Sequence, residues 1–314
     1  MNKVGLFFAI ISAAMAGSSA FAQEPPVAEV EDIVVVARRT AAPVWEVTKD
    51  GRTLILVGAI RGLPKDLSWS PSGLEAATER ADRILYPPEA RASPADLLRL
   101  IWRARTIGAL PRGTTTADHL SPELQARLEA VMATERNQGW RTRSLFVTGF
   151  DLLSDKAGYE RGGRDVEDVV RAAARKARVR GETVGTVRGD EIVDNLITMP
   201  PSAYVPCIEA GLTAAEAGKD SHAARAEAWR RREVPAVLAN PLDRALDRCW
   251  PWGDPELGPQ LRGAWLTAIE TAIQQDGVTL AVAPLRLLAE PAGVLDGLEA
   301  RGFQIAGPAW KAQP

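Results

Sequence analysis

The segment 44–60 constrains the fold most, because it combines two β-prone runs with a turn that fixes how they pair. Val44–Thr48 and Thr53–Ile60 are rich in β-branched and apolar residues, and Asp50 and Gly51 stand between them. Asp-Gly supplies the positive φ angles that a tight antiparallel hairpin needs. The sequence therefore predicts a β-hairpin here, and with it a sheet.

Helical patterns separate the later β-prone runs. Strands are expected near 82–86, 182–187, 278–283 and 303–306. Helices are expected at 70–83, 93–107, 121–134, 144–159, 165–178 (ended by Gly181), 202–238, 257–275 and 292–301. Strands that alternate with long helices indicate an α/β fold. We expect a central mixed or largely parallel sheet covered by helices, with a helix-rich insertion; an α+β arrangement is the alternative.

The helix expected at 93–107 carries one apolar stripe. Leu97, Leu98, Ile101 and Trp102 recur at the spacing that places side chains on one face of a helix. Such a face usually packs inward, so we expect these four side chains to be core residues.

The first 22 residues have the pattern of a secretory signal peptide. A lysine at position 3 precedes an apolar run over 4–16, and Ala20-Phe21-Ala22 fits the small-residue cleavage site. We expect cleavage after Ala22 and a periplasmic or secreted protein. Later segments stay below about 18 uninterrupted apolar residues, so no transmembrane span is expected in the mature chain.

Charge and cysteine content narrow the class of protein further. A formal net charge of −2 argues against nucleic acid as a partner, which would call for a strongly basic surface. Cys207 and Cys249 are the only cysteines, and after export an even pair usually forms a bridge. We expect one disulfide, with two separately buried thiols as the alternative.

Residues 23–42 read as a flexible leader that contains one β-prone segment. That segment is made of Asp32, Ile33, Val34, Val35 and Val36. It resembles the TonB box, a short strand that pairs with an edge strand of a TonB-like partner. Packing as an edge strand on its own domain is the other interpretation.

Two strand ends carry a family resemblance. Gly58-Ala59-Ile60-Arg61, followed by Leu63-Pro64, resembles the opening motif of the TraB/PrgY/GumN family, which reads Gly-x-x-His. Ala283-Pro284-Leu285-Arg286-Leu287 is similar to that family's second Gly-x-x-His-Leu motif. The resemblance covers roughly residues 43–307, so we expect 43–314 to form a single domain of this family.

The resemblance implies an activity that the residues of this chain do not support. Relatives, which include Tiki-type and erythromycin-esterase-like proteins, are regarded as metal-dependent hydrolases with histidines and a strand-end glutamate at one site. Here arginine replaces histidine at positions 61 and 286, and Pro87 replaces the glutamate, with Glu89 the nearest carboxylate. A second family glutamate position is occupied by Arg188. Guanidinium has no lone pair to offer a metal, so we expect no metal and no cofactor.

Few other residues of the chain are candidates for metal binding or catalysis. His119 and His222 are the only histidines, and both are expected to face solvent. A zinc site of three or four His or Cys ligands is therefore hard to assemble. Asp165 matches the family's Gly-x-Asp and Arg262 its Arg-Asn-x-x-Trp motif, with Gly263 in place of Asn.

Arg61, Arg286, Glu89, Asp165 and Arg262 are thus the candidate ligand-binding residues. The two strand-end arginines would either hold a carboxylate or phosphate in a retained cleft or, as we favour, form structural ion pairs with a local carboxylate such as Glu89 or Asp66. We favour a catalytically degenerate binding protein for a peptide, protein or anionic ligand over an enzyme. A hydrolase with a changed, metal-independent site and a TonB-linked accessory of envelope transport are the alternatives.

Overall fold

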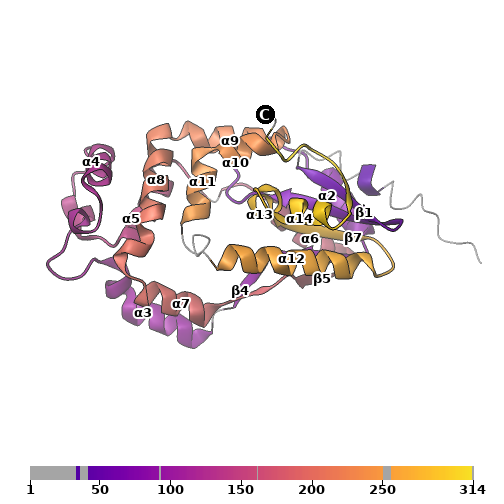
Figure 1. The fold of residues 1–314 in the computed structure, drawn as a ribbon, viewed down its shortest axis with the longest axis horizontal. Coiled ribbons are helices and arrows are strands. Elements are labelled where there is room, and N and C mark those ends of the chain that lie inside the picture. Colours follow the sequence, from indigo (N-terminus) through magenta and orange to yellow (C-terminus); the bar gives the residue numbers. More distant parts are fainter. Residues whose placement is uncertain (1–32, 36–41, 92, 161, 250–255, 313–314) are drawn as a thin grey trace, which may run out of the picture.

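The structure is a computed structural model that describes residues 33–35, 42–91, 93–160, 162–249 and 256–312 (Figure 1). The predicted signal peptide, most of the leader, and Asp32 and Val36 of its β-prone segment lie outside these residues. Ile33, Val34 and Val35 are described, and they form a short helical turn rather than the predicted strand. Ile33 and Val34 are buried in the main core, where their apolar side chains leave water.

A six-stranded sheet in the order β5-β3-β7-β2-β1-β8 forms the centre of the fold. Its strands are β1 (Val44–Lys49), β2 (Arg52–Ala59), β3 (Arg83–Tyr86), β5 (Arg180–Thr183), β7 (Thr279–Pro284) and β8 (Gln304–Ala306). The four strands β5, β3, β7 and β2 are parallel, whereas β1 runs antiparallel to both of its neighbours. The sheet is mixed and mostly parallel, which confirms the predicted α/β class.

The hairpin prediction is confirmed in detail. β1 and β2 pair antiparallel with Lys49 opposite Arg52, so that two residues make the turn. Asp50 and Gly51 adopt φ values of 51° and 76°. These are the positive angles that the Asp-Gly pair was expected to supply.

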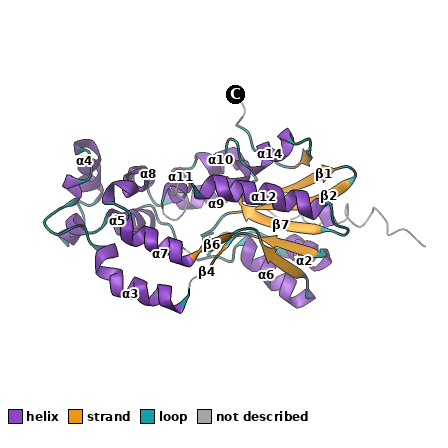
Figure 2. Cartoon of the chain, turned by 60° about the horizontal axis from the view of Figure 1, so that its bottom comes forward, coloured by secondary structure: helices purple, strands orange, loops and turns teal. Residues whose placement is uncertain are grey.

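Helices lie on both faces of the sheet. The longer ones are α2 (Ser72–Arg80), α3 (Pro94–Gly108), α4 (Pro122–Val131), α6 (Val166–Ala177), α7 (Gly189–Thr198), α8 (Val205–Ala217), α9 (Asp220–Arg230), α11 (Pro241–Arg248) and α12 (Leu257–Ile273). The shorter ones are α5 (Leu145–Asp151), which continues into a π-helical turn (Leu152–Lys156), α10 (Val234–Ala239), α13 (Leu285–Ala289) and α14 (Val294–Ala300). Figure 2 shows α12 and α14 on one side of the sheet and α2 and α6 on the other. The main core, with Trp45 and Trp265 fully buried, lies between these layers.

A helical lobe extends from one end of the sheet (Figure 1). It contains α3, α4, α5, α7 and α8, and it has its own core around Leu128, Leu145 and Ile208. The helical region expected at 202–238 is helical, but the chain divides it into α8, α9 and α10. Gly218 and Arg232 cause the breaks, since both adopt positive φ, 78° and 62°, that no α-helix continues through.

The strand predicted at 182–187 is also divided. Gly185, with φ of 79°, separates β5 from β6 (Thr186–Arg188). β6 leaves the main sheet and pairs in parallel with β4 (Glu89–Arg91). Gly181 does not end α6 as predicted but lies in β5; the helix ends at Ala177, and Arg178 takes the left-handed cap position with φ of 60°.

The apolar stripe of α3 is exposed, which contradicts the prediction that it is core. α3 packs on α7 and α5 through its other side. An amphipathic pattern shows that one face differs from the other, but it does not show which face meets the protein. The position of α7, a helix that the sequence reasoning missed, decides this.

Among the described residues, no helix is long and apolar enough to cross a membrane.

The predicted disulfide is present: Cys207 in α8 and Cys249 after α11 are bonded, with their Cα atoms 4.6 Å apart. Both sulfur-bearing side chains are buried in a small apolar cluster with Leu153 and Leu242.

We predict that reducing this disulfide lowers the free energy of unfolding by about 4 kcal/mol, because the bond closes a long loop in the unfolded chain. Urea denaturation with and without a thiol reductant measures the change. The double variant Cys207→Ala/Cys249→Ala is the control, and its stability should not respond to reductant. Two alkylatable thiols in the untreated chain, shown by peptide mapping, would contradict the prediction.

Candidate functional site

Three adjacent parallel strands end at one cleft. β3, β7 and β2 are neighbours in the sheet, and the residues that follow them are Pro87, Arg286 and Arg61. All three residues line a cleft of about 510 Å³. The carboxyl edge of a parallel sheet is where α/β proteins usually bind ligands, and the volume suits a small molecule or short peptide. The motif positions recognised in the sequence therefore meet in space.

One face of α9 fixes the chain that leaves β2. Trp229 Nε1 donates to the Gly58 carbonyl at 3.0 Å, and Arg225 Nη1 donates to the Arg61 carbonyl at 2.9 Å. His222 Nε2 donates to the Gly62 carbonyl at 2.6 Å. These three side chains are spaced so that they share one side of the helix. The backbone that carries Arg61 is thus held at several points.

Asp243 joins the ends of β2 and β7 through two arginines. Its carboxylate accepts from Arg225 Nε at 2.7 Å and from Arg286 Nε at 2.9 Å. Arg286 Nη2 also donates to Asp243 and, at 2.8 Å, to the Leu238 carbonyl. The Arg225 and Asp243 side chains are only 5% and 6% exposed, so this half of the bridge lies out of water, whereas Arg286 is 20% exposed. Buried charges of this kind persist when they are paired and hydrogen-bonded.

The first turn of α11 places Asp243. Asn240 caps the helix, since its Oδ1 accepts from the Leu242 and Asp243 amides at 2.9 and 3.3 Å. Its Nδ2 donates to the Ser221 carbonyl at 3.0 Å, which ties α11 to the start of α9. Pro241 follows the cap at the position where a helix tolerates proline best.

Asp247 and Glu290 are carboxyls in the same cleft with altered acidity. Burial raises the pKa of Asp247 against the opposing charges of Arg286 and Arg248. Burial, together with the nearby Asp247 carboxylate, raises the pKa of Glu290 even though Arg262 Nη1 lies 2.5 Å from its Oε1. Perturbed carboxyl pKa values of this kind are found at functional sites and in structural ion-pair networks alike.

The structure places two of the remaining candidate residues in the cleft and one outside it. Asp165 lines the cleft and also caps α6, and burial raises its pKa despite the hydrogen bond from the Asp168 amide. Arg262 lines the cleft from α12. Glu89 does not line it: this carboxylate accepts from Arg171 at 2.7 Å instead.

The prediction that both histidines face solvent is wrong for His222. This side chain is buried against the Tyr159 ring and bonded to the Gly62 carbonyl, because α9 packs across the end of β2. His119 is partly exposed, and its ring lies 3.2 Å from the Thr114 hydroxyl. Neither imidazole lines the cleft.

The cleft does not fit the metal that the family resemblance implies. Within the described residues, no group of three or more His, Cys, Asp or Glu side chains is arranged to hold an ion. Asp243 is committed to two arginines and Glu290 to Arg262, while Arg61 and Arg286 stand where the family has imidazoles. Guanidinium groups would repel a cation at these positions.

Sequence reasoning missed most of the acidic and basic wall opposite the strand ends. Arg225, Asp243 and Asp247 lie in helices whose sequences match no recognised motif, and Glu290 follows the helix of the second motif but is not part of that motif. One signal was available: Asp243 and Asp247 are four residues apart in the segment Pro241–Arg248, which places both carboxylates on one helix face.

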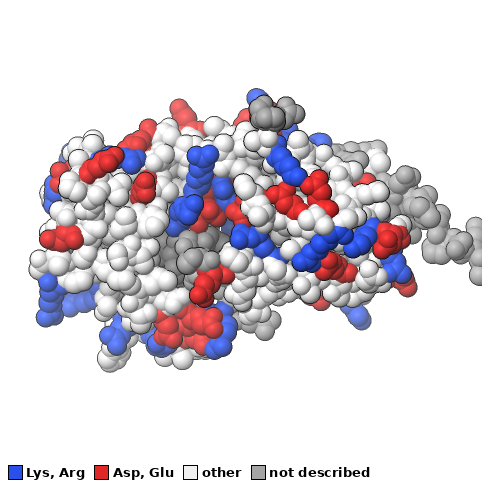
Figure 3. Space-filling view, in the orientation of Figure 1, with Lys and Arg blue, Asp and Glu red and all other residues white. Residues whose placement is uncertain are grey.

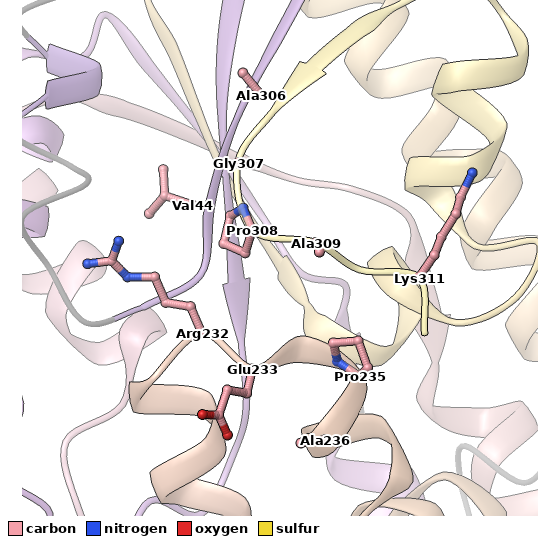
Figure 4. Close-up of a pocket in the computed structure, with 10 residues that line it drawn as sticks. All are labelled: Val44, Arg232, Glu233, Pro235, Ala236, Ala306, Gly307, Pro308, Ala309 and Lys311. Carbon is pink, nitrogen blue, oxygen red and sulfur yellow. The ribbon is translucent and has the colours of Figure 1, made fainter. Parts of the chain in front are cut away.

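A second hollow is lined by fewer charged side chains than the cleft. It lies between the C-terminal segment and the start of α10, and Figure 4 shows Arg232, Glu233 and Lys311 at its edge. Val44, Pro308 and Ala309 supply mainly backbone and short apolar side chains to it.

Figure 3 shows positive and negative side chains interspersed over one face of the molecule, in keeping with the net charge of −2.

Comparison with known proteins agrees with the motif assignment. The TraB/PrgY/gumN family matches residues 43–306, which confirms the resemblance noted in the strand-end motifs. No curated protein and no solved structure matches the chain.

We predict that Asp243→Asn lowers the free energy of unfolding by about 3–5 kcal/mol, because two guanidiniums then lose their shared counter-charge in a buried place. Chemical denaturation measures the loss. Asp190→Asn is the matched control, since Asp190 pairs with Arg188 in an exposed place where such a pair contributes little. Equal stability of the two variants would show that the bridge does not hold the cleft together.

Proposed function

The chain belongs to the TraB/PrgY/gumN family, and we propose that it acts as a binding protein whose cleft holds a ligand with a carboxylate or phosphate group. The ligand is a peptide, another protein segment or a small anion, and metal-dependent hydrolysis is not the activity. The protein works in the periplasm or outside the cell, and its disulfide is consistent with such a compartment.

The observation that carries this proposal is the exchange of both motif histidines for arginines that line one cleft. A guanidinium presents donors in a planar fork that matches a carboxylate or a phosphate. Two such groups at neighbouring strand ends suit an anion better than a cation.

The two arginines have different roles. Arg286 is 20% exposed and is oriented by Asp243 and the Leu238 carbonyl, bonds in which its Nη1 takes no part. Arg61 is 48% exposed, with the Glu167 carboxylate 4.0 Å away. Arg286 is therefore the pre-oriented donor, and Arg61 is the more exposed donor of the two. Pre-orientation reduces the entropy lost on binding.

The carboxyls of the cleft restrict the ligand further. Asp165, Asp247 and Glu290 line the same space as the arginines. A purely anionic ligand would meet repulsion there, whereas a peptide offers amide or ammonium donors as well as a carboxylate. A ligand with both kinds of group, such as a short peptide with a free C-terminus, fits this arrangement best.

We predict that Arg61→Ala abolishes stabilisation by anionic ligands and leaves the melting temperature of the ligand-free protein nearly unchanged. Arg286→Ala should also abolish the ligand effect, but it should lower stability by about 1–3 kcal/mol because Asp243 loses one partner. Thermal shift with phosphate, citrate and short peptides measures both quantities, since a bound ligand raises the melting temperature.

Arg141→Ala is the control for these variants, because Arg141 forms a surface ion pair with Glu129 away from the cleft. It should respond to ligands as the unchanged protein does. An unchanged ligand response in both cleft variants would contradict the binding function.

A hydrolase with a metal-independent site is the second candidate function. The observation that favours it is the pair Asp247 and Glu290, two neighbouring carboxyls whose raised pKa values would let one hold a proton while the other is ionised. In this version Asp247 would exchange a proton with the substrate or a water molecule, and the arginines would stabilise the developing negative charge.

We predict that Asp247→Asn keeps or raises the melting temperature at neutral pH. The folded-state pKa of Asp247 is raised, so the ionised carboxyl destabilises the fold above the pKa of the unfolded chain, and asparagine removes that cost. The gain should shrink as the pH falls and the carboxyl becomes neutral in both states. Thermal unfolding between acid and neutral pH measures it.

The same variant distinguishes the two functions. A hydrolase would lose its turnover of ester or peptide substrates in Asp247→Asn, whereas a binding protein shows no turnover before or after the change. Turnover that survives in the variant would exclude Asp247 as the group that carries the chemistry.

A further inference from the structure

The charged side chains that line the cleft are balanced in number. Among the described residues, five arginines and five carboxyl groups face this one space. They are Arg61, Arg225, Arg248, Arg262 and Arg286, and Asp165, Glu167, Asp243, Asp247 and Glu290. While every group is ionised, an anion that enters the cleft meets as many negative as positive charges. It would bind more tightly if one carboxyl group took up a proton, because a repulsion would then be removed.

Three of these carboxyl groups already accept hydrogen bonds that the fold depends on. Asp243 is bridged by two arginines. Glu167 accepts from Arg171 Nε at 2.9 Å. Asp165 accepts from an amide in the first turn of α6 at 3.0 Å, where it caps the helix. Neutralising any of the three would weaken these bonds, since a charged acceptor makes the stronger hydrogen bond.

Asp247 is placed differently from these three. Its side chain is partly buried on α11, and its carboxylate forms no hydrogen bond or ion pair with any residue that the structure describes. Burial and the nearby charge of Asp243 raise the pKa of Asp247, against the opposing charges of Arg286, Arg248 and Arg262. A carboxylate without a donor of its own loses least when it is neutralised.

Glu290 is the carboxyl group coupled to Asp247. Asp243 and Asp247 are four residues apart on α11, and the Glu290 amide donates to the Arg286 carbonyl at 2.9 Å across one turn at the end of α13. The two helices thus present one acid–base pair and, one turn further along, two acids. The charge of Asp247 raises the pKa of Glu290, while Arg262 Nη1, 2.5 Å from Glu290 Oε1, opposes that rise. Two carboxyl groups coupled in this way hold one proton between them more readily than they both ionise.

We propose that the cleft takes up a proton together with its anionic ligand, and that Asp247 and Glu290 share this proton. The inference rests on the proposed function, because it concerns ligand binding in the same cleft. A proton on this pair removes one negative charge from the space beside Arg286 and weakens the hold of Glu290 on Arg262. The cleft therefore binds its ligand more tightly in acid than at neutral pH.

Other side chains near the pair are competing acceptors of a proton. Tyr159 lines the cleft, and His222 lies behind its ring, bonded to the Gly62 carbonyl and outside the cleft. Burial raises the pKa of Asp165 as well. Substitution of Asp247 and Glu290 separates their contribution from that of these groups.

The pH dependence of sulfate binding tests the proposal, because sulfate keeps its charge between acid and neutral pH. Isothermal titration calorimetry at constant ionic strength measures the affinity at each pH, and buffers with different heats of ionisation count the protons taken up. A bound anion raises the pKa of the pair further, so uptake occurs between the pKa of the free state and that of the bound state. Over this window the affinity should rise by up to about tenfold for each unit that the pH falls, the slope for one proton.

Asp247→Asn/Glu290→Gln should bind sulfate at neutral pH about as tightly as the unchanged protein does in acid, with no dependence on pH. Asp247→Asn alone should already reduce the slope, which provides a second measurement if the double variant does not fold. Asp165→Asn is the matched control: it removes one negative charge from the same cleft, and asparagine still caps α6. This control should bind more tightly at every pH with the slope unchanged.

The possible outcomes distinguish this inference from the binding function itself. A slope that persists in Asp247→Asn/Glu290→Gln would assign the proton to another group, such as His222 or Asp165, and would overturn the proposal. Sulfate binding of equal strength at every pH, lost in Arg61→Ala, would also overturn it but would leave the binding function intact. Absence of sulfate binding at every pH would contradict both.

Discussion

The carboxylate of Asp243 is the constraint on which the cleft depends. It lies between Arg225 and Arg286, and Arg225 in turn holds the Arg61 carbonyl. One buried acid therefore links the ends of β2 and β7 to α9 and α11. Without it, two guanidiniums would face each other at the wall of the cleft with no shared counter-charge. Arg225 and Arg286 are thus a matched set with Asp243, and neither guanidinium would be stable there without that carboxylate.

The sheet was predictable because its signals are local. Asp50-Gly51 fixes the hairpin, and short apolar runs separated by capped helices indicate the parallel strands. The failures arose where tertiary packing decides. Nothing in the sequence near Leu97 shows that α7 covers the other face of α3, and no propensity places Ile33 in the core as a helical turn. Positive φ angles at Gly185 and Arg232 divided elements that apolar pattern alone had joined.

The strand-end motifs indicate where the cleft lies, but they do not identify most of the residues that line it. Strand-end motifs located Arg61, Arg286 and Pro87, and the topology of a parallel sheet brings such positions together. Closeness to Pro87 in sequence predicts Glu89 at the site, yet its carboxylate pairs with Arg171. The wall formed by Asp243, Asp247 and Glu290 comes from segments far along the chain. Long-range contacts of this kind leave no pattern in a single sequence.

The disulfide has a consequence beyond stability. Cys249 directly follows α11, the helix that carries Asp243 and Asp247, and the bond fastens that end of the helix to α8. At its other end α11 is anchored through Asn240 to Ser221. Oxidation therefore closes the second attachment of one wall of the cleft. In the reduced chain, packing against α8 alone would hold that end of α11, so formation of the disulfide fixes the position of one wall of the cleft.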